Sequence, residues 1–416
     1  MQLVAYGAQD IYLTGNPQIT FFKVVYRRHT NFAVESIEQT FNGTADFGKR
    51  VTATISRNGD LIQQMYLEVV LPTVSGSATW TYGIGNALVK QAEIEIGGQL
   101  IDRQYGDWMN IWSELTMTAG KRVGYDNMVG NNLPSAAIQT GSLACASKRR
   151  LYVPFQFWFN RNPGLALPLI ALQYHEVKLN LELRSVADLT NVAAGTTESL
   201  VSCKLYVDYV YLDTDERRRF AQVSHEYLIE QVQFTGAETV AASSSNKNVT
   251  LNFNHPVKEL VWAHTTTTAA VTGYATGNRW FNYSGNIAEK TDSFTTALLQ
   301  LNGHDRFSVR FADYFRKVQN YEHHTNVPRV SAERDVVDNR SQFIYTYSFA
   351  LSPEEHQPSG TCNFSRIDNA VLQLSYGADS QTGASAVTAA MNLNIYAINY
   401  NVLRIMSGMG GLAYSN

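Results

Sequence analysis

The chain has 416 residues, of which 44% are hydrophobic and 17% are charged, and its formal net charge at pH 7 is −3. One hydrophobic core rarely supports such a length, so two domains of about 200 residues each are expected. Charged residues are fewer than the usual quarter of a soluble domain, and no long basic block occurs, which argues against direct packaging of nucleic acid by electrostatics.

The three cysteines, Cys145, Cys203 and Cys362, lie far apart in the sequence and form no CxxC pair. Neither a zinc site nor a disulfide framework is expected, which favours folding in a reducing compartment. The N-terminal residues lack a basic segment followed by an apolar core, and the longest apolar run is broken by Pro168. We therefore expect neither a signal peptide nor a transmembrane helix.

Residues 1–26 contain turn formers such as Gly15 and Pro17 before the apolar run Ile19–Tyr26. We expect an extended N-terminal arm that packs beneath the first domain.

Residues 27–213 alternate short apolar-polar stretches with clusters of Gly, Pro, Asn and Ser, the pattern of a sandwich or barrel. Asn58-Gly59 is a favoured pair for a tight hairpin turn. Asp107 is expected to cap a short helix that ends at Gly120. Its apolar face is expected in the core. Strands are predicted at 34–41, 49–56, 61–71, 88–96, 151–159, 175–183 and 201–212.

Residues 214–224 belong to the most charged interval of the chain, which begins at Asp213, and we interpret them as a linker. Residues 225–405 repeat the strand pattern, with a hairpin turn at Asn302-Gly303 and a second short helix opened by Asp313, whose aromatic stripe, Tyr314 to Tyr321, is expected in the core. Residues 406–416 form a C-terminal tail, and long loops are predicted at 73–86, 121–148, 264–294 and 322–340. Strands are predicted at 227–235, 248–254, 257–263, 296–302, 306–310, 343–351, 370–376 and 393–403.

Four segments of the first half recur in the second half in the same order. Every matched piece has the period of a half-buried strand, which indicates a duplicated β domain. The pairs are "IEQTFNG" from Ile37 with "IEQVQFTG" from Ile229, "IEIGGQLIDR" from Ile94 with "LQLNGHDRF" from Leu299, "VKLNLEL" from Val177 with "VLQLSY" from Val371, and "LYVDYV" from Leu205 with "IYAINY" from Ile395.

The sequence contains no GxSxG elbow, P-loop or HExxH motif, and its histidines lack the spacing of a metal-binding jelly roll. We predict no catalytic, cofactor-binding or metal-binding residues. Among five Asn-x-Ser/Thr sequons, Asn282 lies in a predicted long loop and is the glycosylation candidate.

Segments along nearly the whole chain resemble the major capsid proteins of large nucleocytoplasmic DNA viruses, particularly the chlorella-virus and algal-virus type. They include "YGAQDIYLTGNPQITFFKVVYRRHTNF" from Tyr6, "NPGLALPLIALQYHEVKL" from Asn162, "VDYVYLDTDERRRFAQ" from Val207, "QPSGTCNFSRIDNA" from Gln357 and "NYNVLRIMSGMGGLAY" from Asn399.

This resemblance implies an all-β double jelly roll, two tandem eight-stranded antiparallel sandwiches with short helices in loops. It also implies a homotrimer of roughly hexagonal outline that tiles an icosahedral shell together with neighbouring capsomers and minor capsid proteins. The shell would lie in the virion, over an internal membrane and without direct contact with nucleic acid, after assembly in the host cytoplasm. No enzyme activity and no cofactor are implied.

Two other classes of function are considered. A double jelly-roll enzyme would need carboxylates or His and Met ligands that converge in a cleft, and no spacing in the chain supplies them. A glycan-binding, lectin-like module could use loops such as 264–294 and is compatible with a role in a shell.

Overall fold

Antiparallel strands build most of the protein, as the alternation of apolar and polar residues predicts. In β11 (Val177–Leu183), for example, every second residue is buried. The computed structural model describes residues 7–73, 79–81, 83–131, 143–144, 149–190, 198–266, 280–284, 292–328, 343–377 and 390–414.

The first sandwich consists of two sheets. One is β1 (Phe32–Gln39), β12 (Ser202–Leu212) and β4 (Leu61–Leu71), with β9 (Arg149–Pro154) and β10 (Leu167–Pro168) both paired to β4. The other is β2 (Phe41–Asn42), β3 (Arg50–Thr54), β11, β6 (Val89–Ile96) and β7 (Gln99–Tyr105). A separate ribbon pairs β5 (Thr79–Trp80) with β8 (Leu143–Ala144).

The second sandwich repeats this plan. One sheet is β13 (His225–Phe234), β23 (Met391–Met406), β16 (Pro256–Thr266) and β20 (Tyr345–Ser348), extended by β14 (Glu238–Val240), β21 (Cys362–Asn363) and β24 (Met409–Leu412). The other is β15 (Asn246–Thr250), β22 (Ala370–Ser375) and β17 (Thr296–Leu301), with β18 (His304–Asp305) and β19 (Arg310–Phe311) both paired to β17.

The order of strands identifies both sandwiches as jelly rolls. In each, the first strand of one sheet pairs with the last long strand of the sandwich, β1 with β12 and β13 with β23. That last strand then pairs with the next long strand of the sheet, β4 or β16. The predicted fold class, a double jelly roll, is confirmed.

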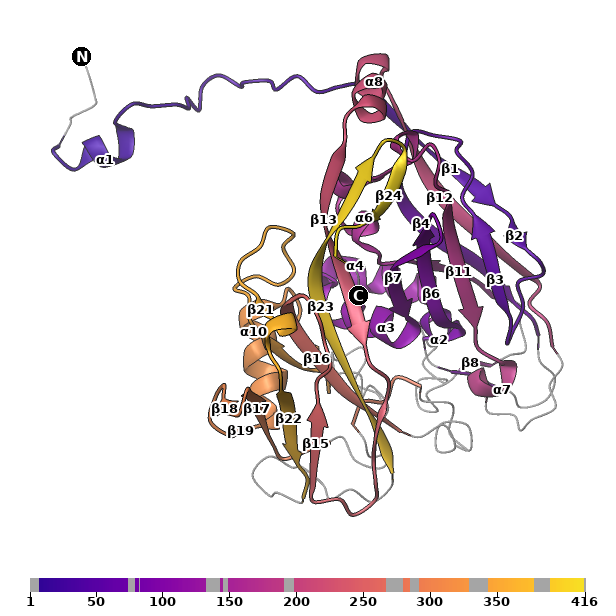
Figure 1. The fold of residues 1–416 in the computed structure, drawn as a ribbon, viewed down its shortest axis with the longest axis vertical. Helices are drawn as coiled ribbons and strands as arrows, with labels where there is room; N and C mark the ends of the chain where they lie inside the picture. The colour runs from indigo at the N-terminus through magenta and orange to yellow at the C-terminus, as the bar shows by residue number, and fades with distance from the viewer. Residues whose placement is uncertain are drawn as a thin grey trace.

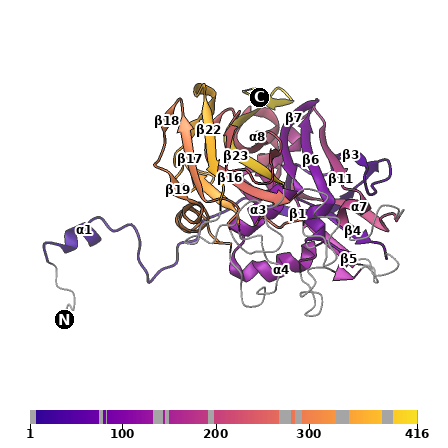
Figure 2. The same cartoon turned by 90° about the horizontal axis from the view of Figure 1, so that it is seen from below.

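The two sandwiches lie side by side and share one continuous hydrophobic core (Figures 1 and 2). Short helices fill the connections rather than forming a layer of their own. They are α1 (Asp10–Thr14), α2 (Ile84–Leu88), α3 (Gly106–Thr116), α4 (Ala119–Val129), α6 (Trp158–Arg161), η1 (Pro163–Leu165), η2 (Leu169–Ala171), α7 (Val186–Leu189), α8 (Thr214–Gln222), η3 (Tyr314–Val318), α10 (Gln319–His323) and η4 (Phe364–Arg366).

One of the two predicted Asn-Gly turns has the expected backbone, and a glycine pair at the equivalent place of the first half has it too. Asn302 and Gly303 have φ values of 52° and 79°, and Gly97 and Gly98 have 58° and 87°, as a tight hairpin turn requires. Asn58 and Gly59 do not have positive φ, so the prediction of such a turn there was wrong. A glycine is instead needed at position 59 because there is no room for a side chain: a Cβ atom would lie 2.7 Å from the Cβ of Tyr209.

The helix predicted from Asp107 forms as α3, but its ends differ from the prediction. Asp107 does not cap it; its carboxylate accepts a hydrogen bond from Trp280 Nε1 at 2.7 Å. The helix stops at Thr116, and Gly120 belongs to the next helix, α4. The segment 121–148 was predicted as a loop, and α4 occupies its first part. The side chain of Asp107, which the local pattern predicts to cap the helix, is thus engaged in a tertiary contact.

The counterpart in the second half is a π-helical turn, η3, continued by α10. Asp313 precedes η3 but does not cap it with its side chain. Phe315 is buried as predicted, whereas Val318 is 40% and Tyr321 is 79% exposed. The prediction that this stripe belongs to the core was therefore wrong for its last two members.

The charged interval that was interpreted as a linker contains helix α8, because Asp213 accepts a hydrogen bond from Thr214 N at its start. None of its residues is buried. Arg217 lies 3.0 Å from Asp60 of the first sandwich. The connection between the sandwiches is thus a short, exposed helix.

The N-terminal arm does not pack beneath its own first sandwich. It leaves the body near α8 and runs away from it (Figure 1). Its apolar side chains are 70–99% exposed: Ile11, Tyr12, Leu13, Ile19, Phe21, Phe22, Val24, Val25 and Tyr26. In the single chain these side chains are therefore not covered by the described residues.

Candidate assembly interface

Polar and aromatic side chains gather where the two sandwiches meet. Across the described ranges, no three His, Cys, Asp or Glu side chains group as a potential metal site. In the same ranges, no helix has the length and hydropathy needed to cross a membrane. The contact between the sandwiches and the surfaces left uncovered are therefore the candidate functional regions.

Edge strand β7 of the first sandwich lies against β13 of the second. Asp102 Oδ1 accepts a hydrogen bond from Val232 N at 3.2 Å, and Gln231 donates its side-chain amide to the carbonyl of Ile101. Burial raises the pKa of Asp102 to about 6, although hydrogen bonds from Gln104 and Val232 oppose the rise. These contacts fix the register of one sandwich on the other.

An aromatic cluster fills the space beside these hydrogen bonds. Tyr396 of β23 lies between Trp108 of α3, with ring centroids 5.2 Å apart, and Phe234 of β13, at 4.8 Å. Phe234 also meets the edge of Tyr105 at 5.1 Å. Offset and edge-on aromatic pairs add about 0.5–1.5 kcal/mol each to what their buried area contributes. The predicted helix face thus packs against the other sandwich as well as its own.

A buried ion network crosses the same contact. Glu230 of β13 pairs with Arg161 of the first sandwich at 3.0 Å and with Lys258 of β16 at 2.8 Å. Lys258 also donates to the carbonyl of Pro353 at 2.7 Å. Burial opposes ionisation of Glu230, but its neighbour His356 and the two cations outweigh it and lower its pKa to about 2. The carboxylate stays charged at any physiological pH.

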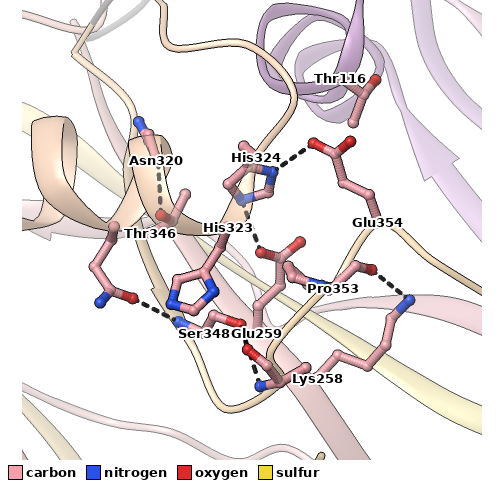
Figure 3. Close-up of polar contacts among 12 residues, drawn as sticks. Thr116, Lys258, Glu259, Asn320, His323, His324, Thr346, Ser348, Pro353 and Glu354 are labelled. Carbon is pink, nitrogen blue, oxygen red and sulfur yellow. Dashed lines mark hydrogen bonds and ion pairs between the residues drawn. The ribbon is translucent and has the colours of Figure 1, made fainter. Parts of the chain in front are cut away.

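A second buried ion group adjoins the first (Figure 3). The imidazole of His324 lies between two carboxylates, with Nε2 at 2.9 Å from Glu259 and Nδ1 at 2.9 Å from Glu354. Thr325 N also donates to Glu354 at 2.9 Å. Burial disfavours the imidazolium, but the two carboxylates outweigh it and raise the pKa of His324 to about 9. His324 is therefore a cation that ties the segment after α10 to strand β16.

The raised pKa of His324 predicts that the folded protein loses stability as the pH becomes alkaline. Its contribution is fully present below the unfolded value of about 6.5 and is lost as pH rises through about 9. We expect a loss on the order of 3 kcal/mol in the free energy of unfolding between pH 6.5 and 10, measured by urea denaturation. The variant Glu259→Gln/His324→Gln, which removes the central pair, should lack this part of the decline. An equal decline in wild type and variant would contradict the assignment.

The charges of the second half carry one sequence signal for this region. Lys258 and Glu259 interrupt an otherwise apolar strand, and both are fully buried. A charged pair inside an apolar run needs partners, since an isolated buried charge is costly. Their partners are Glu230 for Lys258 and His324 for Glu259, which lie on other elements of the chain, so only the fold brings them together.

The glycosylation candidate Asn282 lies in the described residues 280–284. Its side chain is buried, at 3% exposure, and its Oδ1 accepts hydrogen bonds from the backbone and hydroxyl of Ser284 at 3.1 and 2.7 Å. The neighbouring Tyr283 receives a hydrogen bond from Asn110 of α3 at 3.1 Å. Asn282 is thus buried within a short segment whose neighbouring Tyr283 contacts the first sandwich.

Comparison with known proteins gives matches over nearly the whole chain. A family model described as the major capsid protein N-terminus matches residues 20–213, and a model described as the large eukaryotic DNA virus major capsid protein matches residues 216–411. The major capsid protein of Pyramimonas orientalis virus is 53% identical, with 100% of this chain and 99% of that protein covered. The corresponding protein of Paramecium bursaria Chlorella virus 1 is 46% identical, with the same coverage.

Solved structures match equally well. A chain of the quasi-atomic model of the PBCV-1 virus capsid has a TM-score of 0.79 and 42% identity, covering 95% of this chain and 100% of that chain. The Faustovirus major capsid protein has a TM-score of 0.71 at 12% identity, covering 96% and 94%, which is a likeness of fold alone.

Proposed function

Because this chain belongs to the major capsid protein family of large eukaryotic DNA viruses, we propose that it is a structural subunit that self-assembles into pseudo-hexagonal trimers. Such trimers would tile the facets of an icosahedral shell, and the protein would reside in the virion capsid. The match to a chain of an assembled capsid supports this proposal.

One observation carries the proposal: two jelly rolls of equal topology are joined by a single core. A trimer of such chains has six similar sandwiches around its axis. It can therefore offer nearly equivalent edges at intervals of about sixty degrees and pack into a continuous sheet by repeated heterologous contacts. The buried ion pairs and aromatic rings between the sandwiches support a rigid building block.

For the domain organisation we propose an arm at 1–26, a first jelly roll at 27–213, a linker at 214–224, a second jelly roll at 225–405 and a tail at 406–416. The boundary between the two family models, at residues 213 and 216, and the exposed helix α8 support the position of the linker.

For partners we propose neighbouring capsomers and minor capsid proteins, with an internal membrane beneath the shell and no direct contact with nucleic acid. Assembly would take place in the cytoplasm of the infected host cell. The net charge of −3 supports the exclusion of nucleic acid, because neutralising phosphates requires many Lys and Arg residues.

We also propose that the protein has no catalytic activity. The family role is structural, and the carboxylates Glu230, Glu259 and Glu354 are held in ion pairs. The alternative of a double jelly-roll enzyme would require turnover of a substrate. A glycan-binding function of the outer loops is compatible with the capsid role.

Glycosylation of Asn282 remains a prediction. Since the folded side chain is only 3% exposed, a sugar would have to be attached before this segment folds. The sequon residues Asn42 and Asn248 are exposed and provide a comparison within the same chain. Mass spectrometry of peptides from purified virions would identify the occupied sites.

The test of the proposed function is the mass of the purified chain by size-exclusion chromatography with light scattering, followed by electron microscopy. A stable trimer that forms hexagonal arrays or particles is expected. A purified chain that remains monomeric under all the conditions tested would contradict the proposal.

Deleting residues 1–25 is expected to leave both sandwiches folded but to impair trimer or array formation. The large apolar side chains of the arm are exposed in one chain, and such surfaces are normally covered by a partner. Thermal unfolding checks the fold, and light scattering and microscopy check assembly. The double variant Phe21→Ser/Phe22→Ser, with the arm at full length, should show part of the same defect. Unchanged assembly in both proteins would show that the arm has no role in it.

A further inference from the structure

The second jelly roll carries an addition at its end that the first jelly roll lacks. After β12 the chain continues directly into helix α8, whereas after β23 it turns back and adds strand β24. The turn has two residues, Ser407 and Gly408, with φ values of 52° and 79°, as a tight hairpin requires. We call residues 403–412 the C-terminal hairpin. It lies at the same end of the molecule as α8 (Figure 1).

The outer edge of β24 is hydrogen-bonded to the first sandwich. Nδ1 of His175 lies 3.1 Å from the amide nitrogen and 2.9 Å from the carbonyl oxygen of Gly410, so the ring satisfies one of these two backbone groups. Leu412 N donates to Oε1 of Gln99, the first residue of β7, at 3.1 Å. Side chains of the first sandwich thus occupy the edge that a further strand of the second sandwich would use.

Glycine at position 410 permits this close approach. Gly410 is buried, and a Cβ atom there would lie 2.6 Å from Cδ2 of Leu172 and 3.3 Å from Cγ2 of Ile96. Both side chains belong to the first sandwich and are fully buried, so neither can move aside without disturbing the core. The neighbouring Met409 points the other way and is 52% exposed. One face of β24 therefore packs on the first sandwich and the other faces solvent.

The loop that receives the hairpin, residues 172–175, is itself held in place. The guanidinium of Arg57 donates hydrogen bonds to three backbone carbonyls of this loop. Tyr174 N, within the loop, donates to the carbonyl of Gly408 in the hairpin turn at 2.9 Å. The loop follows η2, which lies against α8. The hairpin thus docks on a surface that the first sandwich fixes by its own hydrogen bonds.

We propose that the C-terminal hairpin is a strap that fastens the second sandwich to the first at the α8 end of their contact, and that stable trimers need it closed. An isolated two-stranded hairpin is marginally stable in water, so the contacts with the first sandwich are what hold β24 in place. A ring of three chains requires a fixed angle between the sandwiches of each chain. A loose joint would have to be ordered on assembly, at a cost in conformational entropy. The second part of this proposal rests on the proposed trimer.

The test compares two neighbouring residues of β24. Gly410→Val places a side chain against Leu172 and opens the strap, whereas Met409→Val changes a residue that faces solvent. Hydrogen exchange, followed by mass spectrometry, reports the strap through the amide of Tyr174, which donates to Gly408 when the strap is closed. We expect exchange at Tyr174 to be about tenfold faster in Gly410→Val and unchanged in Met409→Val. Circular dichroism and thermal unfolding establish that both variants are folded.

A second variant does not depend on the tolerance of the hairpin to valine. Arg57→Ala leaves the hairpin intact but releases the receiving loop, so exchange at the amide of Leu412 should also rise by about tenfold. Its control is Arg404→Ala, because Arg404 lies in the hairpin but pairs with Glu226 of its own sandwich, where both side chains are exposed. Exchange as slow in Gly410→Val and Arg57→Ala as in the wild type would overturn the strap.

Trimer stability tests the role of the strap in assembly. In size-exclusion chromatography with light scattering over a dilution series, the wild type and Met409→Val should remain trimeric to about tenfold lower concentrations than Gly410→Val or Arg57→Ala. Faster exchange with an unchanged trimer would overturn the role in assembly. A monomeric wild type would instead overturn the proposed function, and exchange at Tyr174 would still decide whether the hairpin is a strap.

Discussion

Replacing Glu230 with Ala is expected to lower the free energy of unfolding by about 3–5 kcal/mol. The carboxylate of Glu230 is the common partner of Lys258, which is fully buried, and of Arg161 in the other sandwich. Its removal leaves a buried ammonium whose remaining partner at hydrogen-bond distance is the carbonyl of Pro353. Uncompensated charge of this kind is much more costly than the loss of a surface pair. Urea denaturation at pH 7 measures the change.

The same strand offers a matched control. Glu226 of β13 pairs with Arg404 at 2.8 Å, but its side chain is 59% exposed. Glu226→Ala should change the free energy of unfolding by about 0–1 kcal/mol, since solvent screens an exposed pair. Equal effects of the two substitutions would mean that Glu230 is not in a desolvated network. Because Glu230 connects the sandwiches, its variant should also separate their unfolding into two steps.

Replacing Trp108 with Ala is expected to cost about 3–5 kcal/mol. The indole is fully buried and touches Trp112 in its own helix and Tyr396 in the second sandwich. Truncation to a methyl group opens a cavity at the centre of the shared core, which the neighbouring strands cannot fill. Thermal and urea unfolding measure the loss, and wild-type stability would show that α3 is not packed between the sandwiches.

The second helical segment provides the control for Trp108. Tyr321 of α10 is 79% exposed, so Tyr321→Ala should change the stability of the single chain by less than about 0.5 kcal/mol. The two substitutions thus separate an aromatic ring that is covered within the chain from one that is exposed in it. A large loss of monomer stability in Tyr321→Ala would contradict the exposed position of its ring.

Much of the fold follows from local patterns. The period of two predicts strands such as β4 (Leu61–Leu71), which has the predicted bounds, and the backbone preference of Asn-Gly predicts the turn at Asn302-Gly303. Some predictions from local patterns were wrong, for example where a residue far away in the sequence makes the contact that was expected to be local. The carboxylate of Asp107 binds Trp280 instead of capping α3, and the strand predicted at 151–159 ends at Pro154 before helix α6.

The duplicated β architecture and the family can be recognised from the chain alone, because alternation, turn residues and long matching segments are encoded position by position. Which charged residues lose their water depends on the fold. The pairs of Glu230 with Arg161 and of His324 with Glu259 join residues 69 and 65 positions apart (230 − 161 and 324 − 259), and burial and charge then set their pKa values. Equally, only the fold shows that Trp108 of α3 is covered whereas Tyr321 of α10 is exposed, since two helical segments at equivalent places of the repeat differ in what lies against them.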